Sequence, residues 1–414
     1  MTLEVLKLRI SGGAGDYKVS ARIGDREAEC DLGELPANLK EQLKTLQDSI
    51  LLTTEGLREE STSTRTKPEN TPNLPTEIDA PASPTVGGSV ANLFAGAVAG
   101  GDIRSIRNIG SRLFNSLFQQ GVYTLYQNAI DEAYKQKKSL PIKLYVETPD
   151  LAYIPWEALY DRQGLFHLCC YGTTPFARTA TVTDSDLFIY DEPPIRILGM
   201  ISAPKSFAGT PQELNTDAEQ TALDRALKPL TDNNQVRLCW TAAGTSRELT
   251  RRIMRGDNGK PWDVLHFIGH GLPGNIVVEE NGGPGYEFLS AEVLKGILSD
   301  PMGPKLVILN SCRGAQNDTV DRFASTAEYL VRGGAIAAVV AMQFDISDRM
   351  AVAFSPIFFD NLMTPNVPIQ KAMTYTRLEL QRRGFTEWIS PVLYMQNKDG
   401  RVIGPASPPA PQRQ

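Results

Sequence analysis

The sequence predicts an α/β fold built on a mostly parallel sheet that is flanked by helices. Over the second half of the chain, short apolar runs alternate with longer stretches whose apolar positions recur at helical spacing, which is typical of repeated βαβ units. The runs are apolar throughout, as in strands that are buried on both faces. With 414 residues and 41% hydrophobic content, the chain is long enough for a sizeable core and more than one domain.

Residues 1–53 are predicted to form a small separate module, a β-meander followed by a helix. Apolar and polar residues alternate over residues 3–11 and 17–23, a third strand is predicted over 26–31, and glycines separate the three. Leucines and an isoleucine then recur at helical spacing over residues 39–50 and would cover one face of the meander. The module is too small to be an enzyme, so we expect it to bind a regulatory protein partner.

Residues 54–90 are predicted to be a flexible linker, because Ser, Thr, Pro and Glu dominate and large apolar side chains are few. The next unit, residues 91–192, contains a predicted amphipathic helix around Leu113 and a strand over 140–148. Pro193-Pro194 marks its end, since a double proline continues neither a helix nor a central strand. The proline-rich residues 399–414 are predicted to be a disordered tail.

Residues 193–398 carry the strongest alternation of strand and helix patterns. Strands are predicted over residues 195–203, 236–242, 264–268, 306–310 and 335–342. Helices are predicted over residues 212–227, 246–255, 290–298, 320–332 and 369–381.

Two of these predicted strands lead to side chains suited to nucleophilic catalysis. The run over 264–268 is followed by His270 between two glycines, and the run over 306–310 by Cys312. The carboxyl ends of parallel strands open onto one crevice, so we expect the two side chains to meet there. An imidazole can take the thiol proton and later protonate the leaving amine of an acyl-transfer reaction. The neighbouring charge of Arg313 would favour the thiolate.

These residues resemble a known class of peptidase. Ser311-Cys312-Arg313-Gly314 is similar to the cysteine context of caspase-type proteases, whose histidine lies about 50 residues upstream. Further segments resemble, in the same order, the CHAT family of bacterial caspase-like cysteine peptidases: residues 154–159, 262–271, 310–312, 333–335 and 388–394.

The resemblance implies a caspase-like fold, with a pseudo-caspase half over 91–192 beside a catalytic half over 193–398. It also implies that the backbone N–H groups of Gly271 and Cys312 form the oxyanion hole. The expected function is a cysteine endopeptidase with a His270–Cys312 dyad, latent until a partner activates it, in antiviral defence or regulated cell death of bacteria. The alternative is a catalytically idle CHAT-type scaffold that binds a partner.

Asp345 and Asp348 are candidates for a substrate pocket. They follow the predicted strand over 335–342, near the sheet edge that forms the primary specificity pocket in caspase relatives, so either could hold a basic side chain. The simpler interpretation is a loop carboxylate in water, or an N-cap at Ser347 or Asp348 for a helix running to Phe359.

Other signals argue against a cofactor or a metal. Residues 269–274 match the G-x-G-x-x-G dinucleotide pattern, but the third glycine leads into a strand-like run rather than a helix, so no nucleotide cofactor is predicted. His266 shares a strand face with His270 and is predicted to be a core residue. Cys30, Cys169, Cys170 and Cys239 form no C-x-x-C pair, so no zinc site is expected.

Composition and charge argue against several classes of protein. A net charge of -6 and an isoelectric point near 5.4 argue against a general nucleic-acid binder. Five cysteines without a spaced framework argue against a disulfide-stapled secreted protein. The beginning of the sequence lacks the apolar region of a signal peptide, and no run is long enough for a membrane helix, so a cytoplasmic protein with a protein or peptide substrate is expected.

Overall fold

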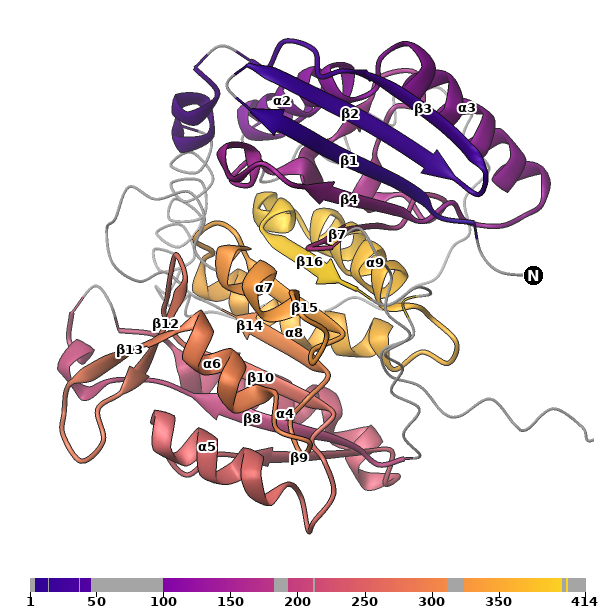
Figure 1. Ribbon diagram of the computed structural model, residues 1–414. Coiled ribbons are helices and arrows are strands. Elements are labelled where there is room, and N and C mark those ends of the chain that lie inside the picture. The colour runs from indigo at the N-terminus through magenta and orange to yellow at the C-terminus, as the bar shows by residue number, and fades with distance from the viewer. Residues whose placement is uncertain are drawn as a thin grey trace, which may run out of the picture.

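The computed structural model is organised around one sheet of 11 strands with helices on both faces (Figure 1). Its strand order is β3-β2-β1-β4-β7-β16-β15-β14-β10-β8-β9, and most neighbours are parallel, which confirms the predicted fold class. The structure describes residues 4–13, 15–36, 38–45, 100–181, 193–210, 213–310, 324–396 and 400.

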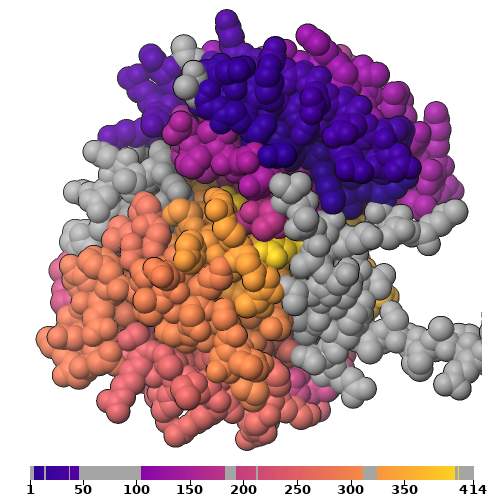
Figure 2. Space-filling model, in the orientation of Figure 1, coloured from indigo at the N-terminus to yellow at the C-terminus, as the bar shows by residue number. Residues whose placement is uncertain are grey.

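The predicted N-terminal meander is confirmed. Strands β1 (Leu6–Gly13), β2 (Asp16–Ile23) and β3 (Arg26–Asp31) pair antiparallel in sequence order. The meander is continuous with the main sheet, because β1 pairs in parallel with β4 (Ile142–Val146). The alternating pattern that suggested a separate unit arises because one face of these strands is exposed while the other is covered by helices. The meander lies at the end of the molecule opposite to β9 (Figure 2).

The rest of the first half is mostly helices and short elements. Helices α2 (Gly100–Leu117) and α3 (Gln120–Lys135) are followed by β4, and β7 (Phe176–Thr179) pairs in parallel with β4. Between β4 and β7 lie single helical turns and one small hairpin: η2 (Pro149–Leu151), η3 (Trp156–Ala158), β5 (Tyr160–Asp161), β6 (Phe166–His167) and η4 (Leu168–Cys170).

The second half contributes a parallel block of strands at the positions that the apolar runs predicted. These strands are β8 (Ile195–Ile201), β9 (Val236–Trp240), β10 (Val264–Ile268), β14 (Leu306–Asn310) and β15 (Ala338–Met342). A further strand, β16 (Pro391–Met395), runs antiparallel to β15 but parallel to β7. The last strand of the second half therefore joins it to the first half.

Helices cover the two faces of this block separately. One face carries α4 (Thr216–Asp232), α8 (Asp348–Leu362) and α9 (Ile369–Arg382), and the other carries α5 (Ser246–Arg255), α6 (Ala291–Leu298) and α7 (Ala324–Val331). Alternate residues of each strand enter different cores: Leu306 and Ile308 pack in one cluster, Val307 and Leu309 in the other. This two-sided burial explains why the strand sequences are apolar at every position.

A small three-stranded sheet follows β10 directly. It consists of β11 (Gly271–Leu272), β12 (Asn275–Glu279) and β13 (Tyr286–Ser290), paired antiparallel. Two single helical turns complete the second half, η5 (Lys205–Phe207) and η6 (Thr386–Ile389). Residues 275–290, which follow the G-x-G-x-x-G pattern, form the hairpin of β12 and β13 and not the helix that a dinucleotide site requires.

The remaining expectations concern parts of the chain with little or no described structure. Residues 39–45 are helical, whereas the rest of that predicted helix, the linker over 54–90 and nearly all of the tail over 399–414 lie outside the described residues. In the described ranges no helix is long and apolar enough to cross a membrane. The proposed domain boundaries stay predictions.

Candidate active site

The strand that leads to His270 and the strand that leads to Cys312 are direct neighbours in the sheet. β10 and β14 are parallel, with Ile268 opposite Asn310. The Gly269 N–H donates to the Asn310 carbonyl at 3.3 Å, so the backbone pairing of the two strands continues one residue beyond the end of β10. His270 and Cys312 each follow this aligned pair by two residues. Cys312 and its neighbour Arg313 lie outside the described residues.

His270 lies in a nearly closed environment, with only 5% of its surface exposed. Its ring meets the ring of Phe207 edge to face, with centroids 5.0 Å apart, and its carbonyl accepts the N–H of Val277 at 3.0 Å. A Cβ on Gly269 would come within 2.6 Å of the Phe267 ring, so only glycine fits between β10 and His270. The backbone on both sides of the histidine is therefore fixed.

A row of aromatic rings extends from His270 to the protein surface. Phe207 packs against Tyr286 with centroids 5.0 Å apart, and Tyr286 against Phe288 at 5.4 Å. Phe288 is 58% exposed and Tyr286 is 45% exposed. These residues do not stand out in the sequence, because the alternation in β13 resembles that of any strand with one solvent face. The apolar Phe207 ring beside the histidine is thus linked to the exposed surface through Tyr286 and Phe288.

Asn310, the last residue of β14, is held from the helix side of the sheet. Its side chain is fully buried, and Nδ2 donates to the Glu219 carboxylate on α4 at 2.7 Å and to the Ala351 carbonyl on α8 at 3.3 Å. A polar residue closing an apolar run was the signal in the sequence that could have identified it. The contact fixes the backbone immediately before Ser311-Cys312.

Asn310→Leu should lower the free energy of unfolding by about 1–3 kcal/mol, because it removes a hydrogen-bond donor from the buried Glu219 carboxylate. A matched control is Asn361→Leu, whose Nδ2 donates to the neutral Ile357 carbonyl at 2.9 Å and should cost only about 1 kcal/mol. Urea unfolding of both variants measures the difference. Equal losses of unfolding free energy in the two variants would mean that the hydrogen bond to Glu219 stabilises the fold no more than a bond to a neutral carbonyl.

The two other histidines are structural. His266 is fully buried on β10, where its Nε2 lies 3.4 Å from Ser355 Oγ, and burial lowers its pKa to about 3. His167 Nδ1 lies 2.9 Å from the Ala158 carbonyl, and burial lowers its pKa to about 4. The prediction that His266 is a core residue is confirmed. Of the other four cysteines, Cys30, Cys169 and Cys170 are buried as expected, while Cys239 is half-buried.

These buried neutral histidines predict a loss of stability in mild acid. An unfolded histidine has a pKa near 6.5, so between that value and about pH 4 the unfolded chain binds more protons than the folded one, and stability falls as the pH falls. Each histidine should contribute about 1 kcal/mol per pH unit in this window. His266→Leu should reduce the slope of unfolding free energy against pH in this window by about 1 kcal/mol per pH unit. Parallel curves for both proteins would contradict the assignment.

Asp345 lies between β15 and α8, and Asp348 is the first residue of α8, at the same carboxyl edge of the parallel block as His270. Both are half-buried. Ser347 is the N-cap of α8, because its Oγ accepts the Met350 N–H at 3.2 Å while donating to Glu387 at 2.6 Å. The alternative predicted for Ser347 is thus what the structure contains, and a substrate-binding role for the two aspartates stays a prediction.

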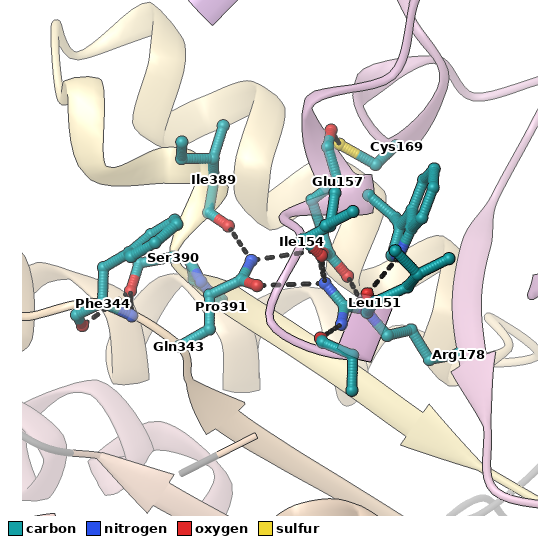
Figure 3. Close-up of polar contacts among 12 residues, drawn as sticks. Leu151, Ile154, Glu157, Cys169, Arg178, Gln343, Phe344, Ile389, Ser390 and Pro391 are labelled. Atoms are coloured by element: carbon teal, nitrogen blue, oxygen red, sulfur yellow. Dashed lines mark hydrogen bonds and ion pairs between the residues drawn. The ribbon is translucent and has the colours of Figure 1, made fainter. Parts of the chain in front are cut away.

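The segment that carries Asp345 is anchored by three buried polar side chains, the Glu157 cluster, made of Glu157, Arg178 and Gln343 (Figure 3). Gln343 follows β15 directly. Its Nε2 donates to Glu157 at 2.9 Å and to the Ile389 carbonyl at 2.8 Å, and its Oε1 accepts from Arg178 at 3.0 Å. One residue on, the Phe344 N–H donates to Ser390 Oγ at 3.2 Å.

Glu157 and Arg178 form an ion pair that water does not reach. Their side chains are at most 1% exposed, and Arg178 Nε donates to Glu157 at 3.0 Å. Burial alone would raise the pKa of Glu157, but the adjacent Arg178 guanidinium holds it below its usual range. Arg178 also donates to the Ala152 and Ile154 carbonyls at 3.0 Å. In the sequence, residues 154–159 and 388–394 stand out only as resemblances to the family; the structure brings them together on either side of Gln343.

Comparison with known proteins matches both halves of the chain to one family. The model of the CHAT domain matches residues 107–393. Curated proteins gave no match.

Several solved structures are similar in architecture. One is separase of Saccharomyces cerevisiae in complex with securin, at 11% identity and a TM-score of 0.47, covering 95% of this chain and 30% of the separase chain. A secreted C11 cysteine protease from Bacteroides thetaiotaomicron matches 46% of this chain and 59% of its own, at 11% identity and a TM-score of 0.31. The chain thus spans less than a third of the separase that it resembles.

Proposed function

The chain belongs to the CHAT domain family, and from that premise we propose that it is a cysteine endopeptidase in which His270 is the general base and Cys312 the nucleophile. The observation that carries the proposal is the pairing of Ile268 with Asn310, which aligns the strands leading to the two residues. Neighbouring strands lie about 4.8 Å apart, so side chains at equivalent positions beyond their ends are within reach of each other.

The proposed reaction proceeds through an acyl-enzyme. His270 takes the proton of the Cys312 thiol, and the thiolate attacks the peptide carbonyl carbon. As the carbon–nitrogen bond breaks, the imidazolium gives its proton to the departing amine, and water then hydrolyses the thioester. The N–H groups of Gly271 and Cys312 would stabilise the oxyanion, and the glycine leaves room for the substrate backbone to approach them. Asp345 or Asp348 would hold a basic side chain before the cleaved bond.

The aromatic row fits the other side of the cleaved bond. Because His270 protonates the leaving amine, the residue that carries this amine must lie beside the histidine, where Phe207 packs. We therefore propose that an apolar residue follows the cleaved bond. Phe207→Ser should raise KM for peptides with leucine or phenylalanine at that position several-fold and leave peptides with serine there unchanged, as steady-state kinetics would measure. The same change for both peptides would rule out a selective contact.

Paired strands in the first half of the sheet connect the N-terminal module with the segment that carries Asp345. Leu8 on β1 pairs with Leu144 on β4, and Leu144 with Arg178 on β7. Arg178 in turn holds Gln343 and so the Asp345 segment. We propose that a protein partner bound at the N-terminal module acts along this route to relieve latency, in a bacterial defence or cell-death pathway.

The experiment that tests the proposed function is a cleavage assay on a library of peptides derived from bacterial proteins, with new termini read by mass spectrometry. Cleavage by the wild-type chain that disappears in Cys312→Ala supports an endopeptidase. A latent peptidase without its partner and an idle scaffold both give no cleavage by either protein, so the reactivity of Cys312 separates them: the scaffold predicts that Cys312 reacts with iodoacetamide as an ordinary thiol. Cleavage that persists in Cys312→Ala would show that another residue is the nucleophile.

A further inference from the structure

A cavity far from His270 gathers arginines at the outer edge of the sheet. It has a volume of about 380 Å³ and is lined by residues of β9, the strand at the edge of the sheet, of the end of α5 and of the loop that follows α5. Figure 1 shows β9 and α5 at the same end of the molecule. Arg237 comes from β9, and Arg251, Arg252 and Arg255 from the last two turns of α5. β8, β9 and β10 are parallel, and Arg237 is near the beginning of β9. The cavity therefore lies at the strand ends opposite to those that lead to the active site.

The charges around this cavity do not balance. Arg237 Nε pairs with Asp257 at 2.9 Å, and Arg251 forms a two-pronged ion pair with Glu248. Arg252 lies over the Trp262 ring instead, 5.3 Å from its centroid, and its buried Nε has no hydrogen-bond partner among the described residues. Arg255 is exposed and forms no ion pair within the described part of the chain. Four arginines thus line the cavity against the carboxylates of Asp257, which also lines it, and Glu248, so two positive charges, those of Arg252 and Arg255, have no carboxylate partner among the described residues. The net charge of the whole protein is -6.

The position of these arginines on α5 explains only part of the excess charge. Cations in the last turn of a helix are stabilised by the helix dipole, which is equivalent to about half a negative charge. That leaves roughly one and a half positive charges, and the i, i+4 spacing of Arg251 and Arg255 is itself unfavourable for like charges. Arg237 adds nothing to this excess, because Asp257 balances its charge. An anion in the cavity would compensate the remaining charge.

We propose that this cavity binds a small organic phosphate. A phosphoryl group carries a charge of about -1.5 to -2 at neutral pH and matches the excess. The planar guanidinium fork binds two phosphate oxygens at once, whereas lysine provides only a point charge. Known ligand pockets measure about 300–1,000 Å³, so this cavity suits a molecule of nucleotide size rather than a bare phosphate. The site is independent of peptide cleavage.

Isothermal titration calorimetry of the full chain at constant ionic strength tests the proposal, with AMP, inorganic pyrophosphate and adenosine as probes. AMP should bind saturably and adenosine should not, because only AMP carries the phosphoryl group. Binding of pyrophosphate as tight as that of AMP would assign the affinity to the phosphoryl group alone, and weaker binding would show that the nucleoside contributes. Either result supports the site.

Arg255→Gln should weaken AMP binding at least about tenfold, since a hydrogen bond to a charged group is lost, and this exposed residue can be replaced without disturbing the fold. Arg382→Gln is the matched control: Arg382 is also an exposed arginine in the last turn of a helix, but it pairs with Glu379 and lies outside the cavity. No saturable binding of AMP or pyrophosphate would overturn the proposal. Equal weakening in the two variants would also overturn it, because it would indicate a general charge effect.

Discussion

Replacing His270 with alanine should slow peptide cleavage by about 10²- to 10⁴-fold, the usual contribution of a general acid–base residue. The reason lies in the alignment of β10 and β14, which places the histidine beyond the end of β10, next to Asn310, the last residue of β14 and two residues before Cys312 in the sequence. The same substitution should shift the pH at which Cys312 alkylation reaches half its maximal rate up towards the value of a free thiol, about 8.5.

The second quantity, the pH dependence of Cys312 alkylation, can be followed without a known partner or substrate. Iodoacetamide labelling at a series of pH values, read by peptide mass spectrometry, measures the reactivity of Cys312, and the half-buried Cys239 in the same sample is an internal reference. Its labelling should be identical in the wild type and in His270→Ala. If Cys312 reacts with the same pH dependence in both proteins, His270 does not act on the thiol, and the dyad is refuted for the isolated chain.

Arg178→Met should lower the free energy of unfolding by about 3–5 kcal/mol, because it leaves the Glu157 carboxylate buried without its cation. The double variant Glu157→Leu/Arg178→Met should recover much of this loss, since it leaves no unpaired charge. Urea unfolding monitored by circular dichroism would measure both.

The control for this prediction is an ion pair of the same type at the surface. Arg9 on β1 and Glu147, the residue after β4, lie 2.6 Å apart, but their side chains are 43% and 42% exposed, so Arg9→Met should cost about 1 kcal/mol or less. A loss in Arg178→Met no greater than that in Arg9→Met would contradict the assigned weight of the Glu157 cluster. A single variant as stable as the wild type would refute it outright.

Three elements were predictable to the residue from local pattern. The strands β10 and β14 and the helix α5 coincide with the predicted ranges, because continuous apolar runs mark buried strands and apolar positions at helical spacing mark a helix. The rule for parallel sheets predicted only that the residues after β10 and β14 open onto the same edge; that the two strands are direct neighbours is a finding of the structure. These local signals are also the ones that identified His270 and Cys312.

Features that depend on distant pairing were not predictable. Nothing in residues 391–395 indicates that β16 lies antiparallel to β15 and parallel to β7, since both neighbours are remote in the sequence. The partners of Glu157 and Gln343 were hidden for the same reason, because a polar residue does not reveal which distant side chain it meets. Asn310 could be recognised as unusual, but not matched with Glu219.

The position of β16 has a consequence for the order in which the protein is synthesised. This strand lies between β7 and β15 and is the last strand of the sheet to leave the ribosome. Until it emerges, β7 and β15 both have an open edge, and the two halves share no strand. Ile389 and Ser390, which anchor the segment carrying Asp345, emerge at the same stage. A nascent chain can therefore complete the proposed substrate site only after the last strand of the sheet has emerged.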